Sequence, residues 1–137
     1  MKRILIATDF SVHSRHTIDS VLKHLHESQT ASQVLLLNTF MVQQTDPALV
    51  IQENDEMKKR SKEGLSQEKS IALGMVQGFN VSIDTASHMG SLNNVIAQLV
   101  HKDKYDLVAM GKDGGRHVAC VSALLKQLQF PLFITFL

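Results

Sequence analysis

Short apolar runs alternate with amphipathic helical patterns along most of the chain, and this order restricts the fold more than any single motif does. Three helical segments share one spacing, with apolar residues at i, i+3, i+4 and i+7, so each carries one apolar stripe suited to one face of a sheet. Strands that alternate with helices in this way predict an α/β fold with a parallel sheet. The stripes are Ile18, Val21, Leu22, Leu25; Leu92, Val95, Ile96, Leu99; and Val121, Leu124, Leu125, Leu128. The apolar runs are Ile4–Ala7, Val34–Leu37, Val81–Ile83, Leu107–Met110 and Leu132–Phe136.

The composition restricts the class of protein without identifying it. The 137 residues suit a single domain, 1–137, and their 14 basic and 13 acidic side chains give a net charge of +1. This balance argues against a nucleic-acid partner bound through bulk charge. No stretch approaches the roughly 20 apolar residues of a membrane span, so no membrane partner is expected. Cys120 is the single cysteine and no cleavable leader is recognisable, which together favour a cytoplasmic location.

The segment from about Pro47 to Gln77 differs from the other helical patterns. Its apolar positions are sparse, and its centre, MKKRSKEG, is strongly charged. This predicts a long, mostly exposed helix that begins at the Asp46-Pro47 pair, with Gly64 and Gly74 as weak points at which the helix bends or frays.

A glycine-rich turn follows the fourth apolar run, in the sequence YDLVAMGKDGG from Tyr105 to Gly115. Glycine allows positive φ and a close approach of the backbone to a phosphate, and a following helix would direct free N–H groups at the anion. Parallel α/β proteins bind ligands at such strand ends. The Gly111–Gly115 turn is therefore the first candidate for a binding site.

Two chemical hypotheses near the first strand are weaker than a structural explanation. Asp9, Ser11 and His13 could combine a nucleophile with a base, but they are crowded within five residues, which is typical of a strand-end turn and a helix cap. His13 and His16 are spaced i, i+3, yet no cysteine or acidic residue stands beside them at ligand spacing. The sequence therefore predicts no catalytic residue and no metal site.

The same segments resemble the universal stress protein family nearly end to end. The opening ATDFS and the late DLVAMG are fairly specific in combination, whereas the other matches are ordinary for α/β proteins. The resemblance implies a three-layer sandwich of the adenine-nucleotide α-hydrolase-like type. Its five-stranded parallel sheet has the order 3-2-1-4-5, with helices on both faces and a ligand crevice between the first and fourth strands. The matching pieces are ILIATDFS at Ile4–Ser11, VLLLNTF at Val34–Phe40, the Gly90 turn, YDLVAMG at Tyr105–Gly111 and FPLFITF at Phe130–Phe136.

The resemblance also implies where a nucleotide would bind. In nucleotide-binding members of the family, an aspartate after the first strand and a residue that ends the second contact adenine or ribose; these would be Asp9 and Thr39. Their phosphate loop has a glycine, two residues, a glycine, nine residues, then glycine with serine or threonine. Gly111 and Gly114, with Gly115 beside them, match the first half only.

The second half of that loop is missing here. Counting back from Pro131, the glycine-serine pair should fall near Val118-Ala119, which leaves three residues between Gly114 and the pair where the family loop has nine. Each lost charge-assisted hydrogen bond to phosphate forfeits roughly 1.5–3 kcal/mol, so we expect no tight ATP binding and no resident cofactor. Asp9 then has two open roles, as a ligand acceptor or as the residue that closes the turn. Arg116 and His117 are candidates for a smaller phosphate site.

The last apolar run, Leu132–Leu137, has too many apolar residues for an exposed sheet edge. The family resemblance implies a homodimer in which the fifth strands meet, and a covering helix is the alternative. We expect a non-catalytic, dimeric stress-response protein that acts through contacts with as yet unknown protein partners. The alternative is a sensor of ATP, ADP or AMP that uses Asp9, Thr39 and a rearranged Gly111–Gly115 loop. A small-molecule enzyme is the weakest hypothesis, since no base or nucleophile is predicted to face the crevice.

Overall fold

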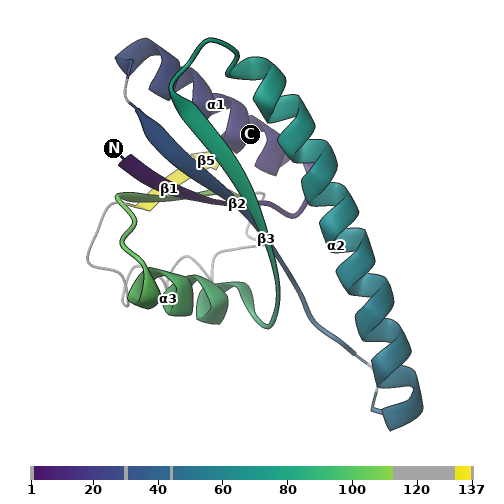
Figure 1. The fold of residues 1–137 in the computed structure, drawn as a ribbon. Helices are drawn as coiled ribbons and strands as arrows, with labels where there is room; N and C mark the ends of the chain where they lie inside the picture. Colours follow the sequence, from purple (N-terminus) through teal and green to yellow (C-terminus); the bar gives the residue numbers. More distant parts are fainter. Residues whose placement is uncertain (1, 30, 44, 113–131, 137) are drawn as a thin grey trace.

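The computed structural model describes residues 2–29, 31–43, 45–112 and 132–136 (Figure 1). The helix expected around Val121–Leu128 lies outside the described residues, and β5 is described by its backbone alone. In chain order the elements are β1 (Lys2–Ala7), α1 (Val12–Ser28), β2 (Ser32–Phe40), α2 (Pro47–Met75), β3 (Val81–Met89), α3 (Leu92–Lys102), β4 (Leu107–Lys112) and β5 (Leu132–Phe136).

The strands form one parallel sheet in the order β3-β2-β1-β4-β5, which confirms the predicted order. Ala7, at the end of β1, lies opposite Leu37 of β2 and Met110 of β4. The chain therefore proceeds from β1 to β2 and β3 on one side, and then crosses to β4 and β5 on the other. The junction of β1 and β4 is the topological switch point, where open α/β sheets bind their ligands.

The sheet is covered on both faces, as expected for three layers (Figure 1). Side chains alternate along each strand, so Ile4 and Ile6 of β1 face the core under α1 and α2, while Leu5 and Ala7 face the core under α3. All four are buried, as is typical of a central parallel strand that is apolar on both faces.

Helix α1 owes its position to one apolar stripe and to a cap at each end. The predicted stripe is buried against the sheet, and Ser11 caps the amino end. The helix stops where Gln29 takes the left-handed conformation at φ 52° and donates its N–H to the last turn. The stripe residues are Ile18, Val21, Leu22 and Leu25.

Helix α2 has 29 residues and begins where expected, with the Asp46 side chain accepting from the N–H of Ala48 at 2.9 Å. It continues through Gly64 and ends at Met75, directly after Gly74. Its buried residues all lie in the second half, and the first half projects beyond the sheet (Figure 1). Those buried residues are Ser61, Leu65, Glu68 and Ala72. None of the described helices is both long enough and apolar enough to cross a membrane.

Candidate functional site

The predicted crevice lies where the carboxyl ends of β1 and β4 meet. The N–H of Thr8 donates to the carbonyl of Leu37 at 2.8 Å, which holds the end of β1 against β2. Asp9 follows directly and is solvent-exposed, and Thr39 is half-buried near the end of β2. Because the strands are parallel, Asp9, Thr39 and Gly111 lie toward one edge of the sheet.

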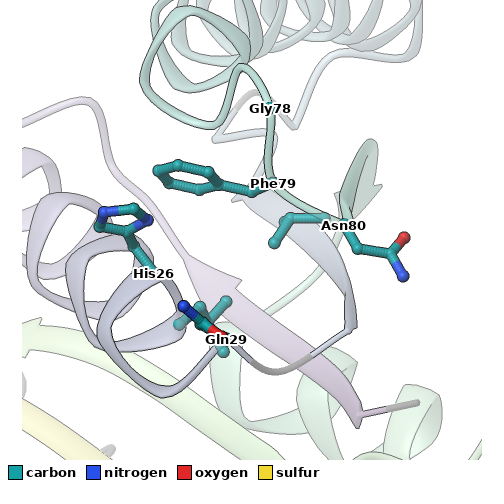
Figure 2. A pocket seen from close by; sticks show the side chains of 7 residues that line it. His26, Gln29, Gly78, Phe79 and Asn80 are labelled. Carbon is teal, nitrogen blue, oxygen red and sulfur yellow. The ribbon is translucent and has the colours of Figure 1, made fainter.

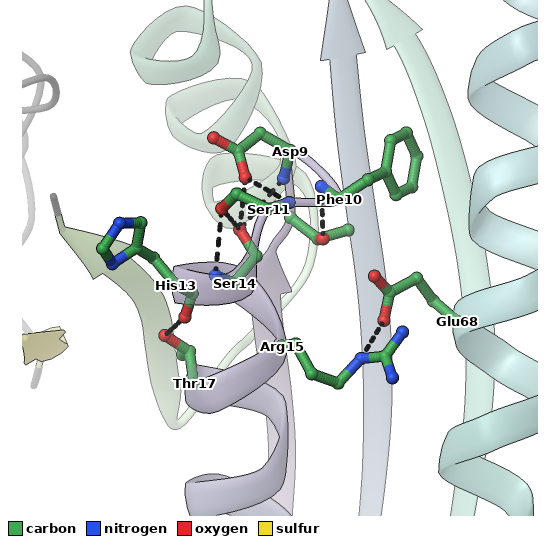
Figure 3. Close-up of polar contacts among 9 residues, drawn as sticks. Asp9, Phe10, Ser11, His13, Ser14, Arg15, Thr17 and Glu68 are labelled. Carbon is green, nitrogen blue, oxygen red and sulfur yellow. Dashed lines mark hydrogen bonds and ion pairs between the residues drawn. The ribbon is translucent and has the colours of Figure 1, made fainter. Parts of the chain in front are cut away.

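Asp9 uses its carboxylate to close the turn between β1 and α1 (Figure 3). Its Oδ1 accepts from the N–H of Ser11 at 3.0 Å and from the hydroxyl of Ser14 at 2.7 Å. The Ser11 hydroxyl oxygen in turn accepts from the N–H of Ser14 at 3.2 Å, as the N-cap of α1. These bonds satisfy donors that the first turn of a helix leaves unpaired. Asp9 therefore closes the turn, and its role as a ligand acceptor stays a prediction.

Ser11 and His13 do not form a nucleophile and base. The Ser11 hydroxyl caps the helix, and the His13 ring points away from it (Figure 3), while the His13 carbonyl accepts from the Thr17 hydroxyl at 3.0 Å. The interpretation as a turn and cap is confirmed. Within the described ranges, no group of three or more His, Cys, Asp and Glu side chains is placed to hold a metal ion.

Phe10 adopts a left-handed backbone with φ 66°, a conformation that is rare for a bulky residue. As a result its ring points toward α2, whereas Asp9 faces the start of α1 (Figure 3). The ring lies over Gly64, where an added Cβ would come within 2.5 Å of the ring Cζ. Gly64 therefore lets an aromatic ring lie directly on the helix backbone, and α2 continues through it as one helix.

A buried polar chain next to the end of β1 was not predicted from the sequence. Asn38 Nδ2 donates to the carbonyl of Thr8 at 2.8 Å, and its Oδ1 accepts from the Ser61 hydroxyl at 2.6 Å. The Ser87 hydroxyl donates to Ser61 Oγ at 2.6 Å. The chain ties the end of β1 to β2, α2 and β3. Its signal in the sequence is Asn38 itself, a polar residue inside the apolar run VLLLNTF, because a buried amide requires partners.

Strand β4 runs two residues further than predicted. Gly111 pairs with Thr135 of β5 and Lys112 with Phe136, so both belong to the strand and not to a turn. The sequence alone favoured an end at Met110, because glycine is a poor strand residue, but pairing with β5 keeps the chain extended. Gly114, Gly115, Arg116, His117 and Val118-Ala119 lie outside the described residues.

A separate cavity of about 290 Å³ opens at the opposite edge of the sheet, between the end of α1 and the turn into β3 (Figure 2). The rings of His26 and Phe79 stack at its side with centroids 4.1 Å apart and an interplanar angle of 15°. Leu25 and Val81 line it with Gln29 and Asn80. Since Asn80 precedes β3 and Gln29 follows α1, this cavity is remote from Asp9 and Thr39.

A comparison with family models shows to which protein family the chain belongs. The model of the universal stress protein family matches residues 1–123. The chain belongs to the universal stress protein family. The match covers the segments from which the resemblance was inferred, except for the last strand. A comparison with curated proteins gave no match.

Solved universal stress proteins share this fold at low sequence identity. UspA from Lactobacillus plantarum aligns with a TM-score of 0.76 at 14% identity, covering 97% of this chain and 96% of its own. A family protein from Arabidopsis thaliana, solved with AMP bound, has a TM-score of 0.68 at 15% identity and coverages of 99% and 92%. The Archaeoglobus fulgidus protein in complex with dAMP has a TM-score of 0.68 at 12% identity, with coverages of 98% and 97%. At these identities the likeness establishes the fold.

Proposed function

We propose that this universal stress protein is a non-catalytic stress-response protein that acts through contacts with other proteins and does not hold ATP tightly. The observation that carries the proposal is the state of Asp9, whose Oδ1 already accepts two hydrogen bonds from the α1 cap. A ribose hydroxyl would have to share the carboxylate with these bonds. The loop from Gly111 also lacks the second glycine-serine element that would hold a triphosphate.

Exposed apolar side chains support a role in protein contacts. Met41 is 52% exposed, Leu49 44% and Ile51 68%. They lie at the end of β2 and on the first turns of α2, where the helix projects from the body (Figure 1). Leu49 and Ile51 are two residues apart and so lie on different sides of the helix, which gives the projecting element apolar side chains for contacts in more than one direction.

Nucleotide titration tests the proposal directly. We expect the melting temperature, followed by calorimetry, to remain unchanged with millimolar ATP, ADP, AMP or cyclic AMP. A ligand at about 100 times its dissociation constant would add about 2.7 kcal/mol of stability, an effect that calorimetry detects easily. A clear shift with ATP would overturn the proposal.

A nucleoside monophosphate sensor is the second candidate. It is favoured because two structural neighbours are described with AMP and dAMP bound, and a single phosphate requires fewer loop donors than a triphosphate does. It would use Asp9, Thr39 and the Gly111–Gly115 segment. A melting shift with AMP but not with ATP, lost in Thr39→Val and retained in the remote Gln29→Ala, would establish this candidate in place of the first.

We also propose a homodimer through the last strand, Leu132–Leu137. In the described sheet β5 is an edge strand, paired only with β4, and an apolar edge requires a cover. Phe133 and Phe136 are three residues apart, so Phe133→Asp and Phe136→Asp test opposite faces of the strand. Burying an unpaired carboxylate at the interface on either face would disfavour the dimer. Sedimentation should show dissociation for at least one variant. An unchanged dimer in both would place the interface elsewhere.

A further inference from the structure

The outer side of α2 carries charges in a marked order. Acidic Asp55 and Glu56 precede Met57, and basic Lys59, Arg60 and Lys62 follow it. All five charged side chains are exposed. Within the described part of the chain, none of them takes part in an ion pair or a hydrogen bond. The local i, i+4 pairs that could have formed, Asp55 with Lys59 and Glu56 with Arg60, are therefore absent, although such pairs are common on helices.

These charges flank a continuous outward stripe. Leu49, Gln52, Glu56, Lys59, Glu63 and Ser66 follow one another at intervals of three and four residues, which places them on one face of a helix. The buried residues Leu65 and Ala72 define the opposite face. Figure 1 shows no described element on the outer side of α2. The stripe can therefore be approached by another helix along its whole length.

A shallow hollow marks the amino half of this stripe. It has a volume of about 170 Å³ and is lined by Leu49, Gln52, Glu53 and Glu56. Glu53 Oε1 accepts from the N–H of Gln43 at 3.1 Å, so one wall is held by the segment that enters α2. The hollow combines an apolar end with carboxylates, and it suits the aliphatic stem and ammonium group of a lysine.

We propose that this surface binds a second copy of the same chain, with the two α2 helices antiparallel. A two-fold axis near Met57 would set Glu56 against Lys59 of the second copy, and Asp55 beside Lys62 of the second copy. The hollow of each helix would face Lys59 and Lys62 of the other, with Gln52 opposite Glu63. A parallel arrangement would bring like charges together, so the order of the charges selects the antiparallel one.

The contact is weak and sensitive to salt. It depends on exposed ion pairs, each of small value, with Leu49 adding apolar area at each end. At about 1 M salt the Debye length falls to about 3 Å, so we expect association to be about tenfold weaker than at about 0.05 M. If β5 already forms a dimer, the contact between α2 helices adds a step from dimer to tetramer. The inference rests on the proposed role in protein contacts. It is tested by the mass of the assembly, whereas the proposed function is tested by nucleotide binding, so one can fail without the other.

Charge reversal tests the inference on the full chain. In sedimentation velocity at low salt, the concentration-dependent association step should be lost in Lys59→Glu. It should be restored in the double variant with Glu56→Lys and Lys59→Glu, because opposite charges then face each other again. Lys23→Glu, an equal charge change on exposed α1, should keep the step. Circular dichroism confirms that each variant is folded. Absence of the step in the unmodified protein, or its persistence in Lys59→Glu, would overturn the inference.

Cross-linking tests the direction of the helices. In a chain with Cys120→Ser, a mixture of Gln52→Cys and Glu63→Cys proteins should be joined by a short bis-maleimide, because these positions face each other only in the antiparallel pair. Each protein alone should give little product, since the cysteines of its two copies would lie about 16 Å apart along the helix axis. Efficient linking of Gln52→Cys to itself would contradict the antiparallel arrangement.

Discussion

The two halves of α2 belong to one helix but differ in what they contact. The second half, 61–75, contains all four buried residues of the helix, and its Glu68 pairs with Arg15 of α1 at 3.2 Å. The first half, 47–60, contains none and projects into solvent. Isolated helices of this length are marginal in water, so the packed half must supply the stability that keeps the projecting half helical. The second half therefore maintains the fold, and the first half presents most of the outward surface.

The largest expected difference between the halves is in the loss of stability when a leucine in each is replaced by alanine. Leu65 is 1% exposed and Leu49 is 44% exposed. Leu65→Ala should lower the free energy of unfolding by about 2–5 kcal/mol, because it removes packed methyl groups and leaves a cavity. Leu49→Ala, the matched control, should change it by less than about 0.5 kcal/mol. Urea denaturation of dilute protein measures both, and equal losses would mean that the halves are equally packed.

The two glycines of α2 provide a second contrast. Nothing lies within 4 Å of a Cβ added at Gly74, so Gly74→Ala should stabilise the protein by up to about 1 kcal/mol through helix propensity. At Gly64 the added Cβ would meet the Phe10 ring, and we expect Gly64→Ala to destabilise by about 1–2 kcal/mol.

The Phe10→Ala background decides whether the ring is the cause. There the collision is absent, so Gly64→Ala should become stabilising, by about the amount found for Gly74→Ala. The sign change in thermal or urea unfolding is the measurement. If Gly64→Ala stays destabilising without the ring, the close contact between ring and helix does not explain the glycine.

The comparison of sequence with structure shows what local patterns can predict. The stripe of α1, the start of α2 at Asp46 and the apolar core of β1 depend on neighbours within one or two turns, and each was confirmed. The strand order came from the family resemblance, since periodicity alone does not specify which strands are neighbours.

What escaped prediction depends on contacts between distant residues. Asn38 meets Thr8 across 30 positions and Ser61 across 23, and no local pattern reveals such partners. From the sequence, Gly64 predicted only a weak point of the helix. Its contact with Phe10 could not be predicted, because Phe10 belongs to another part of the fold. Similarly, β4 exceeds its predicted end because β5 pairs with Gly111 and Lys112. At the candidate site, Asp9 could be located from the sequence, but its engagement with Ser14 could not.

The smallest expected effect concerns the cap of the projecting half. Asp46 accepts from the N–H of Ala48, and removing such a cap typically costs about 1 kcal/mol of helix stability. Because 47–60 contains no buried residue, this loss should appear as local fraying and not as global unfolding.

Hydrogen exchange separates the two possibilities. Asp46→Ala should speed exchange of the amides in the first turns of α2, with the urea midpoint nearly unchanged. Ser91→Ala is the matched control, because Ser91 occupies the N-cap of α3 without a side-chain cap bond, so its loss should not accelerate exchange there. If Asp46→Ala instead lowered global stability by about 1 kcal/mol, the projecting half would be coupled to the core, and the division of α2 into a folding half and a contact half would be wrong.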